Sequence, residues 1–195
     1  SDLTATPTSE TICSGSSTGI ALTSTPAGAT FAWTVAESGT SGASAGAGAN
    51  INQTLSVTGL VSGTTTYTVT PTIGVCVGSP IDVVITVNPT PTVAATPTAE
   101  TICSGTSTGI ALSSTPIGAT FAWTVVESGT SGASAGNGSS INQTLTATGT
   151  AVGTATYTVT PTLGTCVGTP INVVITVNPT PVVLAAPSNE TICSG

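Results

Sequence analysis

Hydrophobic and polar residues alternate along most of this chain. In the first ninety residues the alternating runs cover residues 20–23, 31–35, 51–57, 66–70 and 81–87. Turn-forming stretches such as Pro26-Ala27-Gly28 separate these runs. Alternation with a period of two is typical of strands that place one face on a core and the other in water. The pattern therefore predicts an all-β protein.

The sequence repeats itself with a period of 90 residues. Residues 10–15 recur unchanged at 100–105 and 190–195, and 68 of the 90 positions in residues 1–90 are identical in residues 91–180. This period is too long for a solenoid coil, which repeats every 20–50 residues or so, and suits a complete small domain. We expect one domain in residues 1–90, a second in 91–180, and the first strand of a truncated third repeat in 181–195.

A proline-rich segment marks the boundary between copies. It reads Asn88-Pro89-Thr90-Pro91 in the first copy and recurs at residues 178–181. Alternating proline cannot continue a central strand and favours an extended, semi-rigid conformation. We therefore expect neighbouring domains to be held end to end.

Each copy contains six or seven short strands, with one tryptophan in the third. This arrangement suggests an immunoglobulin-like antiparallel sandwich of two sheets. We expect the aromatic residues Trp33, Tyr67, Trp123 and Tyr157 to pack in the cores, with a sugar-stacking role for tryptophan as the alternative. The glycine-rich residues 38–48 predict a long loop or weak edge strand, which is one place where a ligand could touch the array.

Composition removes several functional classes. The chain has no Lys, Arg or His and a formal net charge of −7. It therefore has no imidazole base and no cationic clamp for an oxyanion, and it suits neither nucleic acid nor an anionic membrane surface. We expect no enzyme, catalytic residue, cofactor or membrane insertion. The seven acidic residues are scattered, so no metal site is expected, although calcium at the domain junctions stays an open alternative.

The five cysteines follow the repeat. They are Cys13, Cys76, Cys103, Cys166 and Cys193, two in each full copy and one in the truncated copy. Two pairings are open. Within each copy, Cys13 would bond Cys76, and Cys103 would bond Cys166; across the junction, Cys13 would bond Cys166. Free or interchain thiols are a third possibility.

Topology favours the junction pairing. Cys13 is expected near the turn between the first two strands and Cys76 near the turn between the last two, at opposite ends of a sandwich. Strands of eight residues or so separate those ends by about 26 Å, whereas a disulfide needs α-carbons within about 7 Å. Head-to-tail stacking would instead bring Cys13 close to Cys166. The cysteines at positions 76, 103 and 193 would then pair with copies outside the sequence.

Several motifs resemble a known family. Thr-Ile-Cys-Ser-Gly at 11–15, Phe-Ala-Trp-Thr-Val at 31–35 and Val-Ile-Thr-Val-Asn-Pro-Thr-Pro at 84–91 resemble the PKD-like and Ig-like tandem repeats of giant surface proteins of Bacteroidota. Gliding-motility adhesins carry repeats of this type. The resemblance implies export by the type IX secretion system, display on the bacterial cell surface and assembly into long filaments.

Three functions are compatible with the sequence. The first is a stiff, disulfide-stabilised stalk of an extracellular adhesin or filament, whose partners are neighbouring repeats and identical chains in a bundle. The second is a set of repeats that bind surface polysaccharide, or another surface ligand, by avidity. The third is an accessory region of a secreted enzyme whose catalytic domain lies elsewhere.

Overall fold

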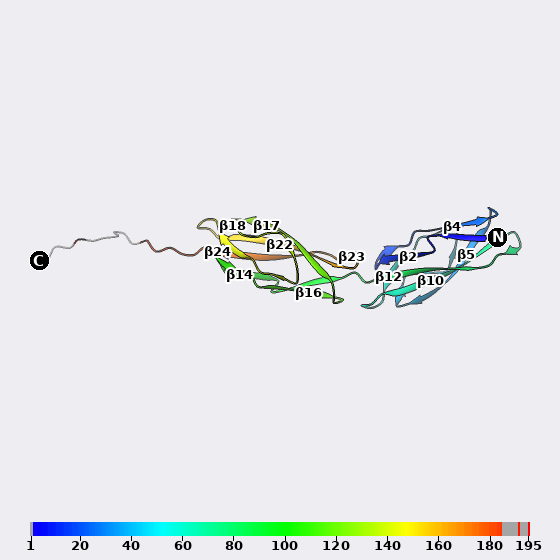
Figure 1. Cartoon of the computed structure of the whole chain (residues 1–195), viewed down its shortest axis with the longest axis horizontal. Coiled ribbons are helices and arrows are strands. Elements are labelled where there is room, and N and C mark those ends of the chain that lie inside the picture. Colours follow the sequence, from blue (N-terminus) through cyan, green and yellow to red (C-terminus); the bar gives the residue numbers. More distant parts are fainter. Residues whose placement is uncertain (1, 185–190, 192–194) are drawn as a thin grey trace.

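Two β-sandwich domains follow each other along the long axis of the molecule, and the chain termini lie at opposite ends (Figure 1). The structure is a computed structural model that describes residues 2–184, 191 and 195. The described residues contain strands, turns and loops but no helix, and so none that could cross a membrane. The chain is therefore all-β, with two domains in tandem.

Domain 1 has twelve strands, many of only two residues. Their bounds are β1 Asp2–Thr6, β2 Ser9–Cys13, β3 Ser16–Ser17, β4 Ile20–Thr25, β5 Thr30–Ser38, β6 Thr40–Ser41, β7 Gly46–Ala47, β8 Asn50–Ile51, β9 Thr54–Val57, β10 Gly63–Ile73, β11 Cys76–Val77 and β12 Ile81–Asn88. One layer runs in the order β2-β12-β10-β5-β7, with β11 paired to β10. The opposite layer is made of β1-β4-β8 and β3-β9-β6.

Domain 2 repeats the same order 90 residues later. Its strands are β13 Thr92–Thr96, β14 Ala99–Cys103, β15 Thr106–Ser107, β16 Ile110–Thr115, β17 Thr120–Ser128, β18 Thr130–Ser131, β19 Gly136–Asn137, β20 Ser140–Ile141, β21 Thr144–Ala147, β22 Gly153–Leu163, β23 Cys166–Val167 and β24 Ile171–Asn178. Its large sheet has the order β14-β24-β22-β17-β19.

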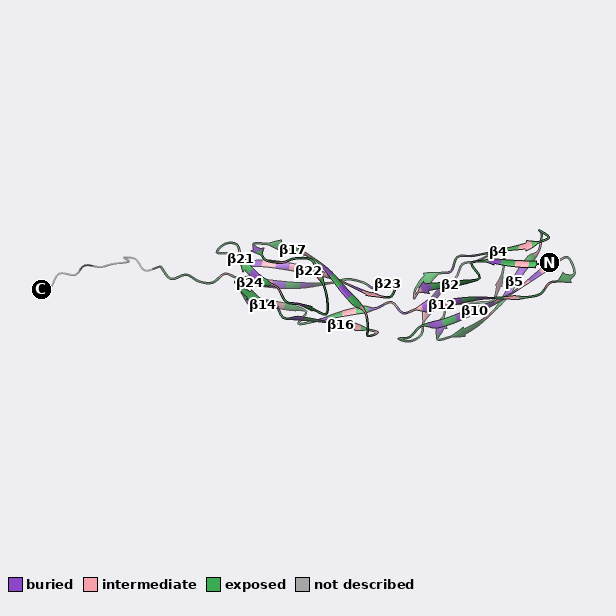
Figure 2. Ribbon diagram, in the orientation of Figure 1, coloured by how far each residue is buried: buried purple, intermediate pink, exposed green. Residues whose placement is uncertain are grey.

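Buried and more exposed side chains alternate along the strands in step with the hydrophobic and polar residues of the sequence. Along β10, Thr65, Tyr67 and Val69 are fully buried, and the threonines between them face outward. Val83, Ile85 and Val87 of β12 fill the same core. β-branched and aromatic residues suit this half-buried pleated surface. Figure 2 shows the buried positions along the strands of each domain.

The first strand of each domain changes sheet, which the sequence interpretation missed. β1 pairs antiparallel with β4, but β2 pairs parallel with β12. Pro7 lies between β1 and β2 and has no N–H to continue the ladder. The chain crosses to the other sheet there and runs beside the last strand in the same direction. The sandwich is thus antiparallel except for this pair.

The two remaining expectations concern irregular segments. The glycine-rich stretch forms the short strands β6 and β7, and β7 is an edge strand on β5. The first strand expected for the third copy falls mainly on residues 185–190 and 192–194, which lie outside the described residues; residues 181–184 are not in a strand.

Candidate functional site at the domain junction

The structure joins Cys13 to Cys166 by a disulfide across the domain junction. Their α-carbons are 5.5 Å apart, although the residues are 153 positions apart in sequence. Neither pairing within a copy is present, because Cys76 and Cys103 are exposed free thiols. Cys193 lies outside the described residues.

Strand ends bring the two cysteines together. Cys13 ends β2, opposite Asn88 at the end of β12, and the next N–H, of Ser14, donates to the Asn88 carbonyl at 2.8 Å. Cys13 therefore sits where the chain leaves domain 1. Cys166 begins β23, a hairpin arm that pairs with the end of β22. That hairpin points at domain 1, so the bond spans the junction.

The proline linker is part of the packed junction. Pro89 and Pro91 are buried, whereas the corresponding residues at the far end of domain 2, Pro179 and Pro181, are half-buried and exposed. The hydroxyl of Thr90 donates to the Ser14 carbonyl oxygen at 3.2 Å, which ties the linker to domain 1. The linker is therefore fixed to domain 1 by a hydrogen bond as well as by the chain itself.

Gly168 holds the other side of the linker. A Cβ on Gly168 would overlap the carbonyl oxygen of Pro91 and would lie 2.8 Å from Pro161 Cγ. Only a residue without a side chain allows the β22–β23 hairpin to approach the linker this closely. Gly168 is buried here, while its counterpart Gly78 in domain 1 is half-buried. Nothing in the sequence pattern singles out Gly168 from the other glycines, so sequence reasoning missed it.

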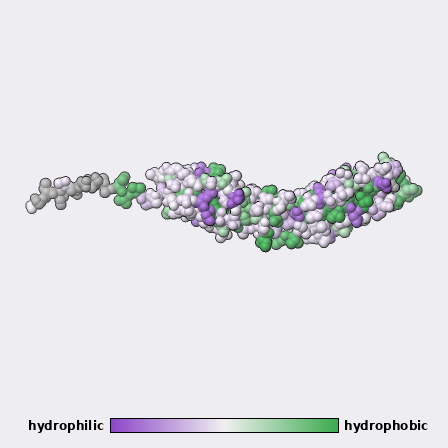
Figure 3. All heavy atoms as spheres, viewed as in Figure 1, coloured by the Kyte–Doolittle hydropathy of each residue, from purple (hydrophilic) through white to green (hydrophobic). Residues whose placement is uncertain are grey.

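An apolar groove of about 470 Å³ runs beside the linker and is lined by both domains. Leu60 and Val61 belong to domain 1, and Ile117 and Leu163 to domain 2. Three of these side chains remain well exposed: Leu60 at 60%, Val61 at 76% and Ile117 at 89%. The space-filling view shows an unbroken surface from one domain to the next, with hydrophobic atoms gathered on one side near the middle (Figure 3).

The aromatic residues lie in the cores. Tyr67 and Tyr157 are fully buried, and Trp33 and Trp123 are 8% and 7% exposed. The indole N–H of Trp33 donates to the Ser44 carbonyl oxygen at 3.1 Å. A Cβ on Gly46 would lie 2.7 Å from the Trp33 ring, so β7 covers that face. Sugar stacking needs an exposed ring face, which these tryptophans lack.

Both tyrosine hydroxyls have a raised pKa. Burial, with a smaller electrostatic contribution from Glu37, raises the pKa of Tyr67 to about 12. Burial and then Glu127 raise the pKa of Tyr157 to about 12 in the same way. The Tyr67 hydroxyl donates to Gln53 Oε1 at 2.9 Å. These hydroxyls therefore stay protonated and structural at neutral pH.

The carboxylates brace loops within each domain. Glu10 accepts a hydrogen bond from the N–H of Gly19 at 3.3 Å, and Glu37 accepts one from Ala43 at 3.0 Å. Glu100 and Glu127 make the same contacts in domain 2. Among the described residues no three acidic or thiol groups gather as metal ligands would.

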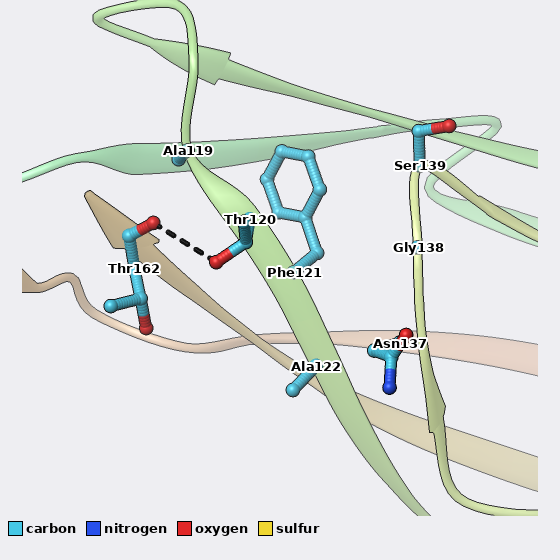
Figure 4. A pocket seen from close by; sticks show the side chains of 8 residues that line it. All are labelled: Ala119, Thr120, Phe121, Ala122, Asn137, Gly138, Ser139 and Thr162. Atoms are coloured by element: carbon cyan, nitrogen blue, oxygen red, sulfur yellow. Dashed lines mark hydrogen bonds between the residues drawn. The ribbon is translucent and has the colours of Figure 1, made fainter. Parts of the chain in front are cut away.

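A shallow pocket of about 480 Å³ opens over Phe121 in domain 2 (Figure 4). It lies between the start of β17 and the segment 137–139, and the Thr120 hydroxyl donates to the Thr162 carbonyl oxygen at 3.3 Å on one side. Domain 1 has the same hollow over Phe31. The lining of the Phe121 pocket is uncharged and mixes apolar residues with hydroxyl and amide side chains, so this pocket offers contact area and hydrogen bonds but no carboxylate, imidazole or thiol.

Comparison with protein families identifies the domains. The PKD-like domain matches the chain twice, over residues 10–91 and 100–181. The chain belongs to the PKD-like domain family. Both matches begin just before the cysteine at the end of β2 or β14 and end in the proline linker, so each PKD-like domain contributes one cysteine to each of its ends. PKD-like domains are typically non-catalytic binding or structural modules.

A search of solved structures also returned matches at low identity. The matches include mouse cadherin-23 EC22-24, with 9% identity and a TM-score of 0.38, covering 88% of this chain and 63% of that one. The four N-terminal Ig domains of Dscam1 isoform 6.9 have 15% identity and a TM-score of 0.31, covering 88% and 43%. The tandem Ig repeats of Dlar have 11% identity and a TM-score of 0.31, covering 88% and 95%. No curated protein matches the sequence.

Proposed function

We propose that this tandem PKD-like segment is a stiff, load-bearing stalk of an extracellular bacterial surface protein. The observation that carries the proposal is the disulfide between Cys13 and Cys166, which links one domain to the next instead of closing each domain on itself. A bond that fixes the angle between domains serves a rod better than it serves an independent binding module.

The bond also changes where tension travels. The two cysteines are 153 positions apart, so 152 residues lie inside the covalent loop that the bond closes. A pull on the chain ends passes through residues 1–13, the two sulfurs and residues 166–195. Most strands of both domains therefore lie outside the load path while the bond is intact.

The rest of the junction supports stiffness. Two buried prolines, the Thr90–Ser14 hydrogen bond and the close contact of Gly168 with Pro91 leave little freedom for bending. The absence of Lys and Arg leaves no cleavage site for trypsin-like proteases, which suits a protein outside the cell. A disulfide between domains fits the same location, because disulfides persist in oxidising compartments.

The specific setting is part of the proposal. Motifs shared with Bacteroidota surface repeats favour a giant adhesin or filament of the gliding-motility type, exported by type IX secretion. The partners are neighbouring repeats and identical chains beside it. The proposal includes no cofactor, and calcium at the domain junctions is its alternative.

Small-angle X-ray scattering tests the rod. Isolated as the monomer by size-exclusion chromatography, the oxidised chain should give one narrow distribution of lengths, and the monomeric Cys13→Ser variant a broader distribution with shorter members. Cys103→Ser is the matched control, because it removes an exposed free thiol at the same position of the other copy. Equal bending in the oxidised chain and the Cys13→Ser variant would argue against a stalk whose stiffness depends on the bond.

A second candidate is ligand binding by the repeats themselves. The shallow pocket over Phe121 recurs over Phe31, and repetition would supply avidity for a surface polysaccharide. A glycan array probed with the two-domain chain and with the Ala122→Trp variant tests it. Binding lost in the variant would favour this candidate, and no binding by either protein would count against it.

A further inference from the structure

Cys76 and Cys103 occupy, at the two outer ends of the molecule, the positions that Cys166 and Cys13 occupy at the bonded junction. Cys103 follows Cys13 by one period, and Cys76 precedes Cys166 by one period. Cys103 lies at the end of domain 2 beside Asn178, and Cys76 lies at the opposite end of domain 1 in the hairpin after β10. Both are exposed free thiols.

The end that carries Cys103 is already shaped like its bonded counterpart. The Ser104 N–H donates to the Asn178 carbonyl at 2.8 Å, as Ser14 does to Asn88. The Ser104 hydroxyl accepts from the Ala147 N–H at 3.0 Å, as the Ser14 hydroxyl does from Val57 at 3.1 Å. The turn that presents the thiol therefore has the same form with and without the bond.

The end that carries Cys76 is also preformed. Cys76 pairs with Ile73 as Cys166 pairs with Leu163. The Gly78 N–H donates to the Pro71 carbonyl at 2.8 Å, as Gly168 donates to Pro161 at 2.9 Å. Position 78 is also a glycine, so it has the space that the linker contact requires at Gly168. Burial differs between the copies: Cys166 is fully buried and Cys76 exposed.

We propose that these two ends form a head-to-tail site for a further copy of the repeat, closed by a Cys103–Cys76 type of disulfide. The inference rests on the proposed stalk function and names its partner. In the bond-forming step, two thiols lose two protons and two electrons to a disulfide oxidant such as oxidised glutathione, which leaves as two molecules of reduced glutathione. The contact is heterologous, so it continues in one direction instead of closing as a symmetric pair.

Continuation of this pattern along an array would create two interleaved covalent paths. Each domain would be bonded to the next domain through its cysteine equivalent to Cys13, and to the preceding domain through its cysteine equivalent to Cys166. Cys193 repeats the register of Cys13 two copies on. Along one such covalent path, only residues 167–192 would separate the bond at Cys166 from the next bond at Cys193. The array would therefore resist extension along its whole length.

The groove residues are not required for this site. Leu60 and Val61 become Thr150 and Ala151 at the far end of domain 2, and Ile117 corresponds to Ala27 at the near end of domain 1. The parts common to every end are the cysteines, the serine turn, the glycine and the proline linker. The apolar groove is thus a local feature of this junction.

Two variants of the full chain test the proposal. Chain X carries Cys76→Ser and Cys193→Ser, so its free thiol is Cys103; chain Y carries Cys103→Ser and Cys193→Ser, so its free thiol is Cys76. Each is incubated alone and mixed with the other in glutathione redox buffer, and covalent dimers are measured on non-reducing gels. We expect the mixed X–Y dimer to exceed X–X and Y–Y by at least about tenfold, because each 1.4 kcal/mol of contact energy between complementary ends gives a factor of ten.

Equal amounts of all three dimers, or no dimer at all, would overturn the proposal. A digest of the same unreduced samples with a glutamate-specific protease separates this failure from failure of the stalk account. Fragment 11–37 linked to 128–190 reports the Cys13–Cys166 bond. If that link is present without a preferred X–Y dimer, only the head-to-tail site fails; if it is absent, the stalk proposal fails as well.

Discussion

At the residue scale, a few glycines decide how closely segments of this protein approach. Gly46 lets β7 lie on the Trp33 ring, and Gly168 lets the β22–β23 hairpin reach the linker. Both positions have an ordinary backbone φ, so the requirement is space and not conformation. Their roles are invisible in the sequence, where they are two among 23 glycines.

The Gly168→Ala variant should loosen the junction without unfolding either domain. Its new methyl group would overlap the Pro91 carbonyl oxygen, and forced overpacking of this kind costs about 1–3 kcal/mol. Thermal unfolding and scattering should show a less stable, more bent molecule. Gly149→Ala is the control in the same domain, since a Cβ there meets nothing within 4 Å, and it should leave both measurements near wild type. Identical behaviour of the two variants would contradict the linker contact.

The buried tyrosines predict a pH dependence at the alkaline end. The folded-state pKa of about 12 lies above the ordinary value of 10.0. The folded state therefore holds its phenolic protons more tightly than the unfolded state. This contribution to stability is fully present below pH 10 and is lost as pH rises towards 12. Phenolate absorbance should appear near pH 12 or together with unfolding, and titration near pH 10 in the folded protein would contradict the buried assignment.

At the scale of elements, the edge strand β7 joins the glycine-rich segment to the large sheet. It pairs with β5 through Ala47 and Gly46, and Gly46 faces the Trp33 ring. Gln53 Nε2 donates to the Ser44 carbonyl oxygen at 2.9 Å and fastens the same segment to the other layer. A stretch that looks like a flexible loop is thus part of the sandwich.

Gly46→Ala should destabilise domain 1 by about 1–3 kcal/mol, because the added methyl group is too close to the tryptophan ring. Chemical denaturation followed by tryptophan fluorescence measures the loss. Gly19→Ala is the control, since a Cβ there meets nothing within 4 Å. A neutral Gly46→Ala would mean that β7 does not pack on the ring.

Much of the fold follows from local patterns, and the exceptions have physical causes. Period-two alternation locates the long strands, and the 90-residue repeat locates the domains, because both depend on residues near in sequence. The parallel pairing of β2 depends on a sheet change at Pro7, and β7 depends on contact with a distant ring. The Cys13–Cys166 bond could be reasoned from topology, because it depends only on which domain ends face each other, whereas the Gly168 contact needs atomic detail.

At the scale of the whole molecule, the disulfide keeps most strands of both domains out of the path of tension. Residues 14–165 lie within the closed loop, and residues 1–12 and 167–195 lie outside it. Domains in a chain without such a bond must each resist unfolding to keep the chain short. Here the disulfide limits the extension to residues 1–13 and 166–195, so β1, β2, β23 and β24 are the strands that carry tension while the bond is intact.

Stretching a single molecule by its two ends tests this central claim most directly. With the Cys13–Cys166 bond intact, full extension should be shorter than in the reduced protein by about 500 Å, since 152 residues at roughly 3.3–3.6 Å each stay inside the loop. The Cys13→Ser variant should extend like the reduced protein, and Cys103→Ser like the oxidised wild type. An oxidised molecule that extends to the full length of 195 residues would contradict a disulfide-stapled, load-bearing stalk.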